Sequence, residues 1–322
     1  MEAFLKYPEL PTLDRLPEIL SVRQVVATEK LHGSNFRAFF PAGMASPDEV
    51  RFGGRNEIFA PGSDGFYGGR PVRWFRERPE LVRRLAEAFA ARDLGDVVLY
   101  GEVCGAGVQK GVRYVEGGEV FFRAFDLRAS GNFVTYDLFA AICDGAGLPR
   151  VPEVWRGEPS REALDALLER PSDEAARNGV ADAANLAEGV VVRSNPLLRD
   201  TYGTWLVIKH KAQKFREAQP RAAREAGPDR GPVDEFVATY VVRGRVVNAL
   251  GRLRDAGTEL KASMQDMPLL SAAVVADLHK ECGPELRALE ARGFDERAIR
   301  NGVSRALAGV YRVLLAEGEV VP

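Results

Sequence analysis

The sequence is poor in the residues that build disulfide frameworks and metal sites. It holds three cysteines and three histidines among 322 residues: Cys104, Cys143, Cys282, His32, His210 and His279. Three is an odd number of cysteines, and none of them forms a C-x-x-C pair. This pattern suggests neither a disulfide framework nor a thiolate zinc site. No histidine has a partner at metal-ligand spacing, so a histidine-based metal centre is not indicated either.

Long apolar runs are also missing. No stretch approaches the apolar length of about 20 residues that spans a bilayer, and the opening MEAFLKYPELPTL lacks the apolar core of a signal peptide. We therefore expect a cytoplasmic monomer without a membrane partner. Hydrophobic residues make up 46% of the chain and charged residues 28%. This composition excludes a disordered chain, and the length allows two domains with packed cores.

The chain has little net charge. A formal charge of -2 and a pI near 6.1 argue against a protein that coats nucleic acid through its overall charge. A polyanion must therefore be held by a local patch, and three segments offer one: the arginines within 70–84, the basic residues within 209–230 and the arginines within 243–254. Solvated helix faces balanced by glutamates explain each patch equally well when it is taken alone.

The first two thirds of the chain mix strand and helix patterns. Six stretches rich in β-branched and aromatic residues predict strands: 25–30, 35–40, 96–103, 120–127, 188–194 and 204–211. Three stretches with helical spacing lie between them: 74–93, 135–147 and 160–170. This mixture predicts an α+β domain with largely antiparallel sheets, which we assign to residues 1–214.

The last third differs in character. Residues 215–232 are rich in charge, alanine, proline and glycine, as a linker would be. Residues 233–322 show no convincing strand pattern but several helical ones, at 236–255, 268–281 and 298–318. We therefore predict a small all-α C-terminal domain. Gly244 lies inside the first of these helical runs and is expected to mark a helix break.

The segment TEKLHGSNFRAFF, residues 28–40, places Lys30 at the end of a strand and before a turn-like His-Gly-Ser-Asn. We predict two strands joined by a tight turn. A lysine in this position is either solvated or a nucleophile. A nucleophilic lysine working near neutral pH must have its pKa of about 10.4 lowered by roughly three units, or about 4 kcal/mol. Neighbouring positive charge or desolvation must supply that shift.

The stretch TWLVIKHK offers such charge. Strand alternation places Lys209 and Lys211 on one face of it. Two ammonium groups there could lower the pKa of a facing lysine and bind a phosphate. The alternative is an edge strand whose lysines prevent aggregation.

Other polar residues lie in unusual surroundings. Glu102 and Glu188 each sit beside a glycine, within or at the edge of an apolar strand, where an unpaired charge is expensive. Phe125 and Asp126 place an aromatic beside an acid in another strand, although Phe125 alone fits a core residue better than a stacking platform. Arg55 follows two glycines, which let a backbone approach a ligand closely.

Taken together, six short motifs occur in order: EKLHGSN, FGGRNE, LYGEVCG, FRAFDLR, AEGVVVRS and WLVIKHK. They resemble the six nucleotidyltransferase motifs of the covalent lysyl-AMP ligases and capping enzymes. The K-x-H-G-x-N form of the first is similar to the nick-sealing RNA ligase family, and FLKYPEL and GVQKGVRY resemble the same family. A lone K-x-H-G would be a weak signal, whereas six motifs in order are a strong one.

The resemblance implies a nucleotidyltransferase (ATP-grasp-like) fold and an ATP-dependent RNA ligase. In such an enzyme a lysine takes AMP from ATP and passes it to a 5'-phosphate, and a 3'-hydroxyl then displaces the AMP. The implied partner is RNA with 5'-phosphate and 3'-hydroxyl ends, in a duplex or at a nick, with a DNA splint as a further option.

The resemblance also assigns roles to residues. The implied catalytic residues are Lys30, His32, Lys209 and Lys211. The implied nucleotide-binding residues are Glu29, Lys30, Leu31, Asn35, Arg55, Glu102, Phe125, Glu188, Lys209 and Lys211. Glu188 would also bind the metal, Mg²⁺ or Mn²⁺. Asn35 and Arg55 would contact the nucleic acid, and so would Arg245 in a helical domain that helps to grip it.

Two other functions remain open. A DNA-joining or guanylyl-transferring relative would share these motifs, but the K-x-H-G form and the absence of a β-rich, OB-like tail count against it. An inactive nucleic-acid-binding module would keep the fold. The joint presence of Lys30, Glu102, Glu188, Lys209 and Lys211 counts against that alternative, because buried charges without a ligand are a liability.

Overall fold

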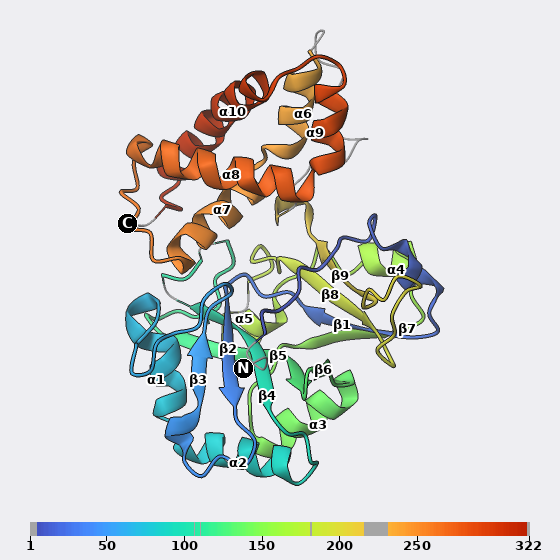
Figure 1. The fold of residues 1–322 in the computed structure, drawn as a ribbon, viewed down its shortest axis with the longest axis vertical. Coiled ribbons are helices and arrows are strands. Elements are labelled where there is room, and N and C mark those ends of the chain that lie inside the picture. Colours follow the sequence, from blue (N-terminus) through green and yellow to red (C-terminus); the bar gives the residue numbers. More distant parts are fainter. Residues whose placement is uncertain (1–4, 106, 110, 181, 216–230, 321–322) are drawn as a thin grey trace. The chain divides into compact units, whose positions relative to one another are not determined.

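The chain forms two compact units in a computed structural model, Met1–Ala212 and Gln213–Pro322 (Figure 1). The structure describes residues 5–105, 107–109, 111–180, 182–215 and 231–320. Most of the predicted linker, residues 216–230, lies outside the described residues. Each unit has its own hydrophobic core.

Four antiparallel strands form the first sheet of unit 1, called sheet A, in the order β7-β1-β8-β9. Its strands are β1 (Val25–Glu29), β7 (Glu153–Gly157), β8 (Gly189–Ser194) and β9 (Val207–Lys211). All five residues of β1 are buried. The N-terminal segment runs along β9, where the Lys209 N–H donates to Pro11 O at 2.9 Å. This segment covers β9 at Lys209, so an anti-aggregation role for that lysine is not required there.

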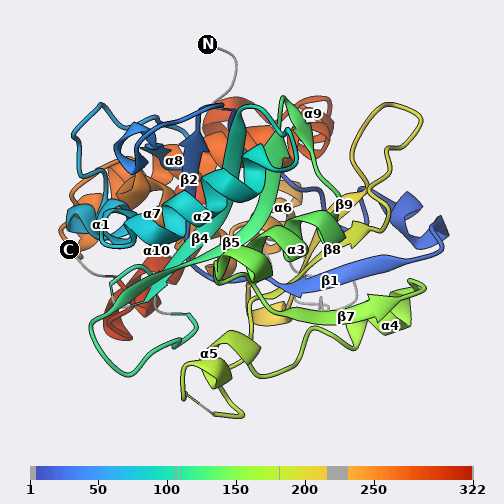
Figure 2. The ribbon, with the colours of Figure 1, turned by 90° about the horizontal axis from the view of Figure 1, so that it is seen from below.

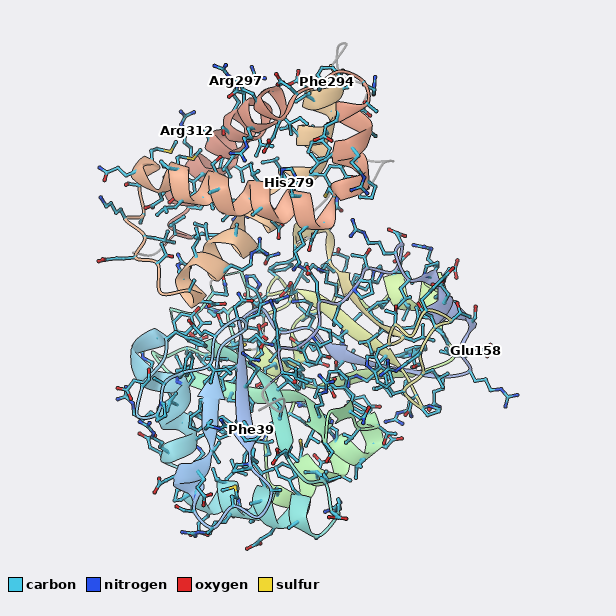
Figure 3. The ribbon with its side chains drawn as sticks, in the orientation of Figure 1. Phe39, Glu158, His279, Phe294, Arg297 and Arg312 are labelled. Carbon is cyan, nitrogen blue, oxygen red and sulfur yellow. The ribbon has the colours of Figure 1, made fainter. Side chains whose placement is uncertain are left out.

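Five antiparallel strands form the second sheet, called sheet B, in the order β3-β2-β4-β5-β6. Its strands are β2 (Ser34–Phe40), β3 (Arg51–Gly53), β4 (Val97–Gly105), β5 (Val120–Ala129) and β6 (Asn132–Phe133). One face packs against α1 (Arg70–Arg76), α2 (Pro79–Ala90) and α3 (Tyr136–Ala146) (Figure 2). Phe36 lies in this core, with ring centroids 5.8 Å from Phe75 and 6.0 Å from Phe122. A smaller cluster, separate from that core, contains Phe39, Val98 and Tyr100 (Figure 3 labels Phe39).

The predicted pair of strands joined by a tight turn is wrong in one respect. Both strands form, but β1 belongs to sheet A and β2 to sheet B, so the chain crosses between sheets over residues 30–33. Gly33 makes this crossing possible. A Cβ there would lie 2.2 Å from Val103 O and 2.6 Å from Cys104 Sγ, where no side chain fits. The motif around Lys30 is therefore a junction between the sheets rather than a hairpin.

Proline and short elements account for other differences from the sequence-based expectation. The helix expected at 74–93 is two helices, because Pro79 starts α2 and cannot continue α1. The remaining helices of unit 1 are short, α4 (Arg161–Asp165) and α5 (Asp173–Arg177). The 3₁₀ turns are Pro17–Ser21, Pro47–Glu49, Tyr67–Gly69, Gln213–Phe215 and Met264–Asp266.

Unit 2 contains helices and no strand in the part that the structure describes. Its helices are α6 (Pro232–Tyr240), α7 (Arg243–Asp255), α8 (Met267–Glu281), α9 (Gly283–Glu290) and α10 (Glu296–Ala316). The expected break at Gly244 is wrong, because the chain leaves helical geometry at Val241 and Val242. Gly244 instead lies buried in the first turn of α7.

The predicted fold class, α+β with antiparallel sheets followed by an all-α region, is confirmed. Among the described residues, no helix combines the length and the apolar character that crossing a membrane requires.

Candidate functional site

Two lysines and a glutamate meet at one end of sheet A. The Lys30 N–H donates to Gly189 O at 2.9 Å, and Gly189 pairs with Lys211 on the other side. Residues directly opposite each other in an antiparallel sheet point to the same face, so Lys30 and Lys211 flank the glycine on one face. Glu188 Oε1 lies 2.8 Å from the Nζ of Lys30 and 3.3 Å from the Nζ of Lys211. Lys209 lies two residues before Lys211 and so shares this face.

Gly189 is required between the two lysines. Its φ of +148° is rare for residues with a side chain, and a Cβ would lie 2.1 Å from His210 O. Only a glycine therefore lets β8 approach the β9 backbone this closely between Lys30 and Lys211.

His32 approaches the same carboxylate from the crossover between the sheets. Its Nδ1 lies 3.2 Å from Glu188 Oε2, and its backbone N–H donates to the Tyr114 hydroxyl at 2.7 Å. Burial by itself raises the pKa of Glu188, but Lys30, Lys211 and His32 outweigh it and hold that pKa well below its usual range. Glu188 is therefore an ionised carboxylate surrounded by cationic and donor groups.

Sheet B contributes a row of three polar residues on the face opposite its helices. Asn35 on β2 pairs with Glu102 on β4, which pairs with Arg123 on β5. Asn35 Oδ1 is buried and makes no hydrogen bond to the described residues. Glu102 is half-buried. An acceptor amide oxygen and a carboxylate thus stand side by side, which suits hydroxyl and amine donors of a ligand.

Phe125 occupies a β-bulge. Tyr100 pairs with Asp126 and Gly101 with Ala124, so Phe125 is the extra residue of β5. A bulge re-aims the side chain that it carries. The half-buried Phe125 ring meets the Tyr7 ring edge to face at 4.9 Å between centroids.

Asp126 supports its neighbours. It accepts from the Tyr7 hydroxyl at 2.9 Å and pairs with Arg193 at 3.1 Å. Arg193 also donates to Phe125 O at 3.2 Å, so it fixes both residues of the motif. Arg193 is 2% exposed and therefore acts inside the protein.

The loop with Arg55 is held by two other cations. Arg37 is 2% exposed, and its guanidinium donates to Gly54 O at 2.8 Å and Glu57 O at 3.1 Å. Burial lowers the pKa of Arg37. Lys6 donates to Asn56 Oδ1 at 2.6 Å. Arg55 itself is half-buried between these anchored positions.

Glu29 points away from Lys30, as strand alternation requires. Its carboxylate accepts from Ser172 Oγ at 2.5 Å and from the Glu174 N–H at 2.9 Å, at the start of α5. Burial raises the pKa of Glu29 to about 7. Both carboxylate oxygens therefore bind the protein. Leu31, 4% exposed, packs into the interior.

Arg245 lies inside unit 2. It is 2% exposed, forms ion pairs with Asp277 and, at 3.4 Å, with Glu281, and donates to Tyr240 O at 2.8 Å. This burial does not agree with the predicted contact to nucleic acid. The guanidinium instead joins α7 to α8.

Four residues that hold the site were not singled out from the sequence. They are Arg37, Tyr114, Arg123 and Arg193. Arg37 and Arg193 interrupt apolar strands, which is the signal that drew attention to Glu102 and Glu188. Tyr114 ends the GVQKGVRY segment, but nothing in the sequence shows that its hydroxyl meets His32.

The site lies where the chain leaves sheet A for sheet B, with Lys30 at the start of the crossover and Lys209 and Lys211 on β9. A family model described as RNA ligase matches residues 23–208. Since this match covers more than half of the chain, the chain belongs to the RNA ligase family. A search of curated proteins found no match.

Solved structures of an RNA ligase from Naegleria gruberi are similar to this chain. A mutant form with AMP and Mn shares 16% identity at a TM-score of 0.49, covering 66% of this chain and 57% of that one. The same ligase with PPi shares 16% identity at a TM-score of 0.47, with the same coverage. The chain therefore spans just over half the length of these matches.

Proposed function

We propose that the protein is an ATP-dependent RNA ligase that joins 5'-phosphate and 3'-hydroxyl ends at nicks in duplexes, through a lysyl-AMP intermediate. The observation that carries this proposal is the meeting of Lys30, Lys211 and Glu188 on one face of sheet A. Two lysine side chains meet one buried carboxylate here, and lysine ammonium groups suit a phosphate.

Lys30 is the proposed nucleophile, and its side chain is 24% exposed. Attack needs the neutral amine, whereas the Glu188 carboxylate stabilises an ammonium, so Lys30 must leave Glu188 before the step. The Nζ–P bond then forms, the bond to the bridging oxygen breaks, pyrophosphate leaves and the amine gives up a proton. Lys209 and Lys211 offset the charge on the α-phosphate, and His32 handles the leaving group.

The row on sheet B serves the rest of the nucleotide. In this proposal Phe125 stacks on the adenine and Glu102 accepts from the ribose hydroxyls. Asn35 and Arg55 contact the phosphates, first of ATP and then of the 5' end of the RNA. The buried Oδ1 of Asn35 is an acceptor, so it would take a donor such as a water, and the Nδ2 of the same amide is the group that would donate to a phosphate.

Glu188 is the proposed metal ligand. Among the described residues, no group of three or more His, Cys, Asp or Glu side chains could hold a metal ion. A single carboxylate still fits Mg²⁺ or Mn²⁺, because Mg²⁺ in phosphoryl-transfer sites commonly uses one or two carboxylates with waters and substrate phosphates. When bound, such an ion neutralises charge on the phosphate oxygens.

Unit 2 is the proposed grip on the nucleic acid. Arg245 is engaged inside it, so we assign phosphate contact to the exposed Arg297, Arg305 and Arg312 of α10 (Figure 3 labels the first and last). These residues lie on one side of the helix and span about 22 Å along it. Their spacing suits several phosphates of a duplex.

Incubation with labelled ATP or labelled GTP, followed by denaturing electrophoresis, tests the donor. Label from ATP alone is expected on the protein, and label from GTP would move the assignment to a guanylyl-transferring relative. A nicked RNA duplex and a nicked DNA duplex then test the substrate. Lys30→Ala should still seal a strand that is already adenylylated, because that strand carries the product of the lysine's steps. Loss of that activity as well would contradict the order of steps.

A further inference from the structure

A buried network on the far side of β1 leads away from the nucleophile. Glu29 is the residue before Lys30, and its carboxylate binds both Ser172 Oγ and the Glu174 N–H at the start of α5. The Glu29 N–H donates to Pro152 O at 2.8 Å. The backbone that carries Lys30 is therefore fixed to α5.

The Glu174 side chain of α5 reaches sheet B. Glu174 is fully buried, at 0% exposure, and its Oε1 lies 2.6 Å from Arg123 and accepts from Asn178 Nδ2 at 3.0 Å. The Arg123 guanidinium stacks 4.5 Å above the Phe121 ring. Arg123 stands directly opposite Glu102 on β4. The network therefore runs from the residue beside Lys30 to the residue beside Glu102.

Packing alone does not explain this network. A helix of five residues such as α5 does not hold its shape by backbone hydrogen bonds alone. A buried ion pair is weak evidence for stability, because the loss of hydration offsets much of the attraction and apolar side chains often serve as well. A charged, hydrogen-bonded joint differs from an apolar one in fixing direction and distance. Because this joint lies between the segments that carry Lys30 and Glu102, it can fix the distance between them.

We propose that α5 is a strut between the sheets, in which Glu174 and Arg123 are positioning residues that set the distance from Lys30 to the nucleotide bound on sheet B. This inference rests on the proposed function. Lys30 belongs to sheet A, while Glu102 and Asn35 belong to sheet B, so their separation depends on what joins the sheets. In-line attack on phosphorus requires reacting atoms about 3–3.5 Å apart, and a misplacement of about 1 Å can cost roughly a hundredfold in rate.

Single-turnover formation of lysyl-AMP tests the strut. Glu174→Gln keeps the side-chain volume and removes the charge that holds Arg123. At saturating ATP the rate constant of Glu174→Gln should fall at least about tenfold. The ATP concentration that gives half of the maximal rate constant should change less than threefold. Glu174→Asp and Arg123→Lys keep their charges. Each should therefore react at a rate between those of Glu174→Gln and the wild type. The double variant Glu174→Gln, Arg123→Lys should be no slower than its slower parent, because both act through one joint.

The matched control lies on the same helix. Asp173 forms a more exposed ion pair with Arg170 at 2.7 Å, so Asp173→Asn removes a charge from α5 without touching Arg123. Its rate should stay within twofold of the wild type. Rates are referred to folded protein, measured by thermal unfolding of each variant.

The outcomes separate the two proposals. The strut is overturned if the wild type is adenylylated and Glu174→Gln reacts at the same rate per folded molecule. The ligase assignment then stays intact. Equal losses in Glu174→Gln and Asp173→Asn also overturn it, because any damage to α5 would then suffice. If Glu174→Gln does not fold, Arg123→Lys decides alone: an unchanged rate overturns the strut. A wild type that never gains AMP removes the proposed function and the strut with it.

Discussion

The two units each bury a cluster of charged side chains, and the two clusters are built differently. Around Glu188, two lysines face one carboxylate, and Lys30 is 24% exposed. Around Arg245, two arginines face two carboxylates, Arg245 pairing with Asp277 and Glu281 and Arg252 with Asp277 at 2.7 Å. Solvent reaches a lysine of the first cluster, whereas Arg245 at the centre of the second is 2% exposed. A lysine cluster that solvent reaches can take up an anion, whereas a closed cluster only joins its elements.

Lys211→Met should give the largest effect, because it removes the positive charge beside Glu188 and Lys30 and keeps the length of the side chain. We expect the rate of lysyl-AMP formation to fall by about a hundredfold, in the range seen when one transition-state donor is removed. Rapid quenching with labelled ATP measures it. Arg161→Met, in an exposed ion pair with Asp14 of the same unit, is the control. If the rate of Lys211→Met stays within threefold of the wild type, the cluster around Glu188 only joins its elements, as the cluster around Arg245 does.

Arg245→Ala should act on stability instead. It leaves Asp277 and Glu281 short of a partner inside unit 2, and breaking a buried pair in this way costs about 3–5 kcal/mol. Chemical unfolding should show this loss while lysyl-AMP formation by folded protein is unchanged. Arg300→Ala is the contrast, since its ion pair with Glu296 is 61% exposed on the arginine side and is expected to contribute little. Loss of adenylylation in folded Arg245→Ala would erase the distinction between the clusters.

Glu29 predicts a pH dependence of stability opposite in sign to that of Glu188, whose pKa is lowered. Its pKa is about 7 in the folded protein against 4.5 for an ordinary glutamate, so the native state keeps a proton that the unfolded chain releases. Stability from this group is complete below pH 4.5 and is lost as the pH rises through 7, by about 3 kcal/mol at most. Glu29→Gln should flatten the free energy of unfolding between pH 5 and 8 relative to the wild type. An unchanged pH profile would show that Glu29 is ionised throughout.

The arginines of α10 should give the smallest effect. Removing two exposed phosphate contacts with Arg297→Ala and Arg312→Ala should weaken binding to nicked RNA several-fold and reduce the slope of log affinity against log salt by about 2. The double variant Arg287→Ala, Arg292→Ala removes two exposed arginines that lie outside α10 and serves as control. If both double variants lose the same affinity for nicked RNA, the arginines of α10 form no specific contact and unit 2 attracts RNA only through its overall charge.

Local sequence patterns predicted the features that depend on neighbouring residues, such as the face of a strand on which a side chain lies. Alternation within β9 placed Lys209 and Lys211 on one face, and charges inside apolar strands pointed to Glu102 and Glu188. The same alternation would have turned Glu29 away from Lys30. What escaped the sequence depends on distant partners: β2 pairs with β4 rather than β1, and Arg245 looks exposed until Asp277, 32 residues on, is placed beside it. No local pattern encodes either meeting.

Lys30 is the proposed nucleophile toward ATP. The intact mass of the protein, before and after incubation with ATP and magnesium, tests it most directly, using a sample first treated with pyrophosphate to remove any AMP already attached. We predict a gain equal to one AMP in the wild type and none in Lys30→Ala. A folded wild type that gains no mass, or a Lys30→Ala variant that gains as much, would contradict the account.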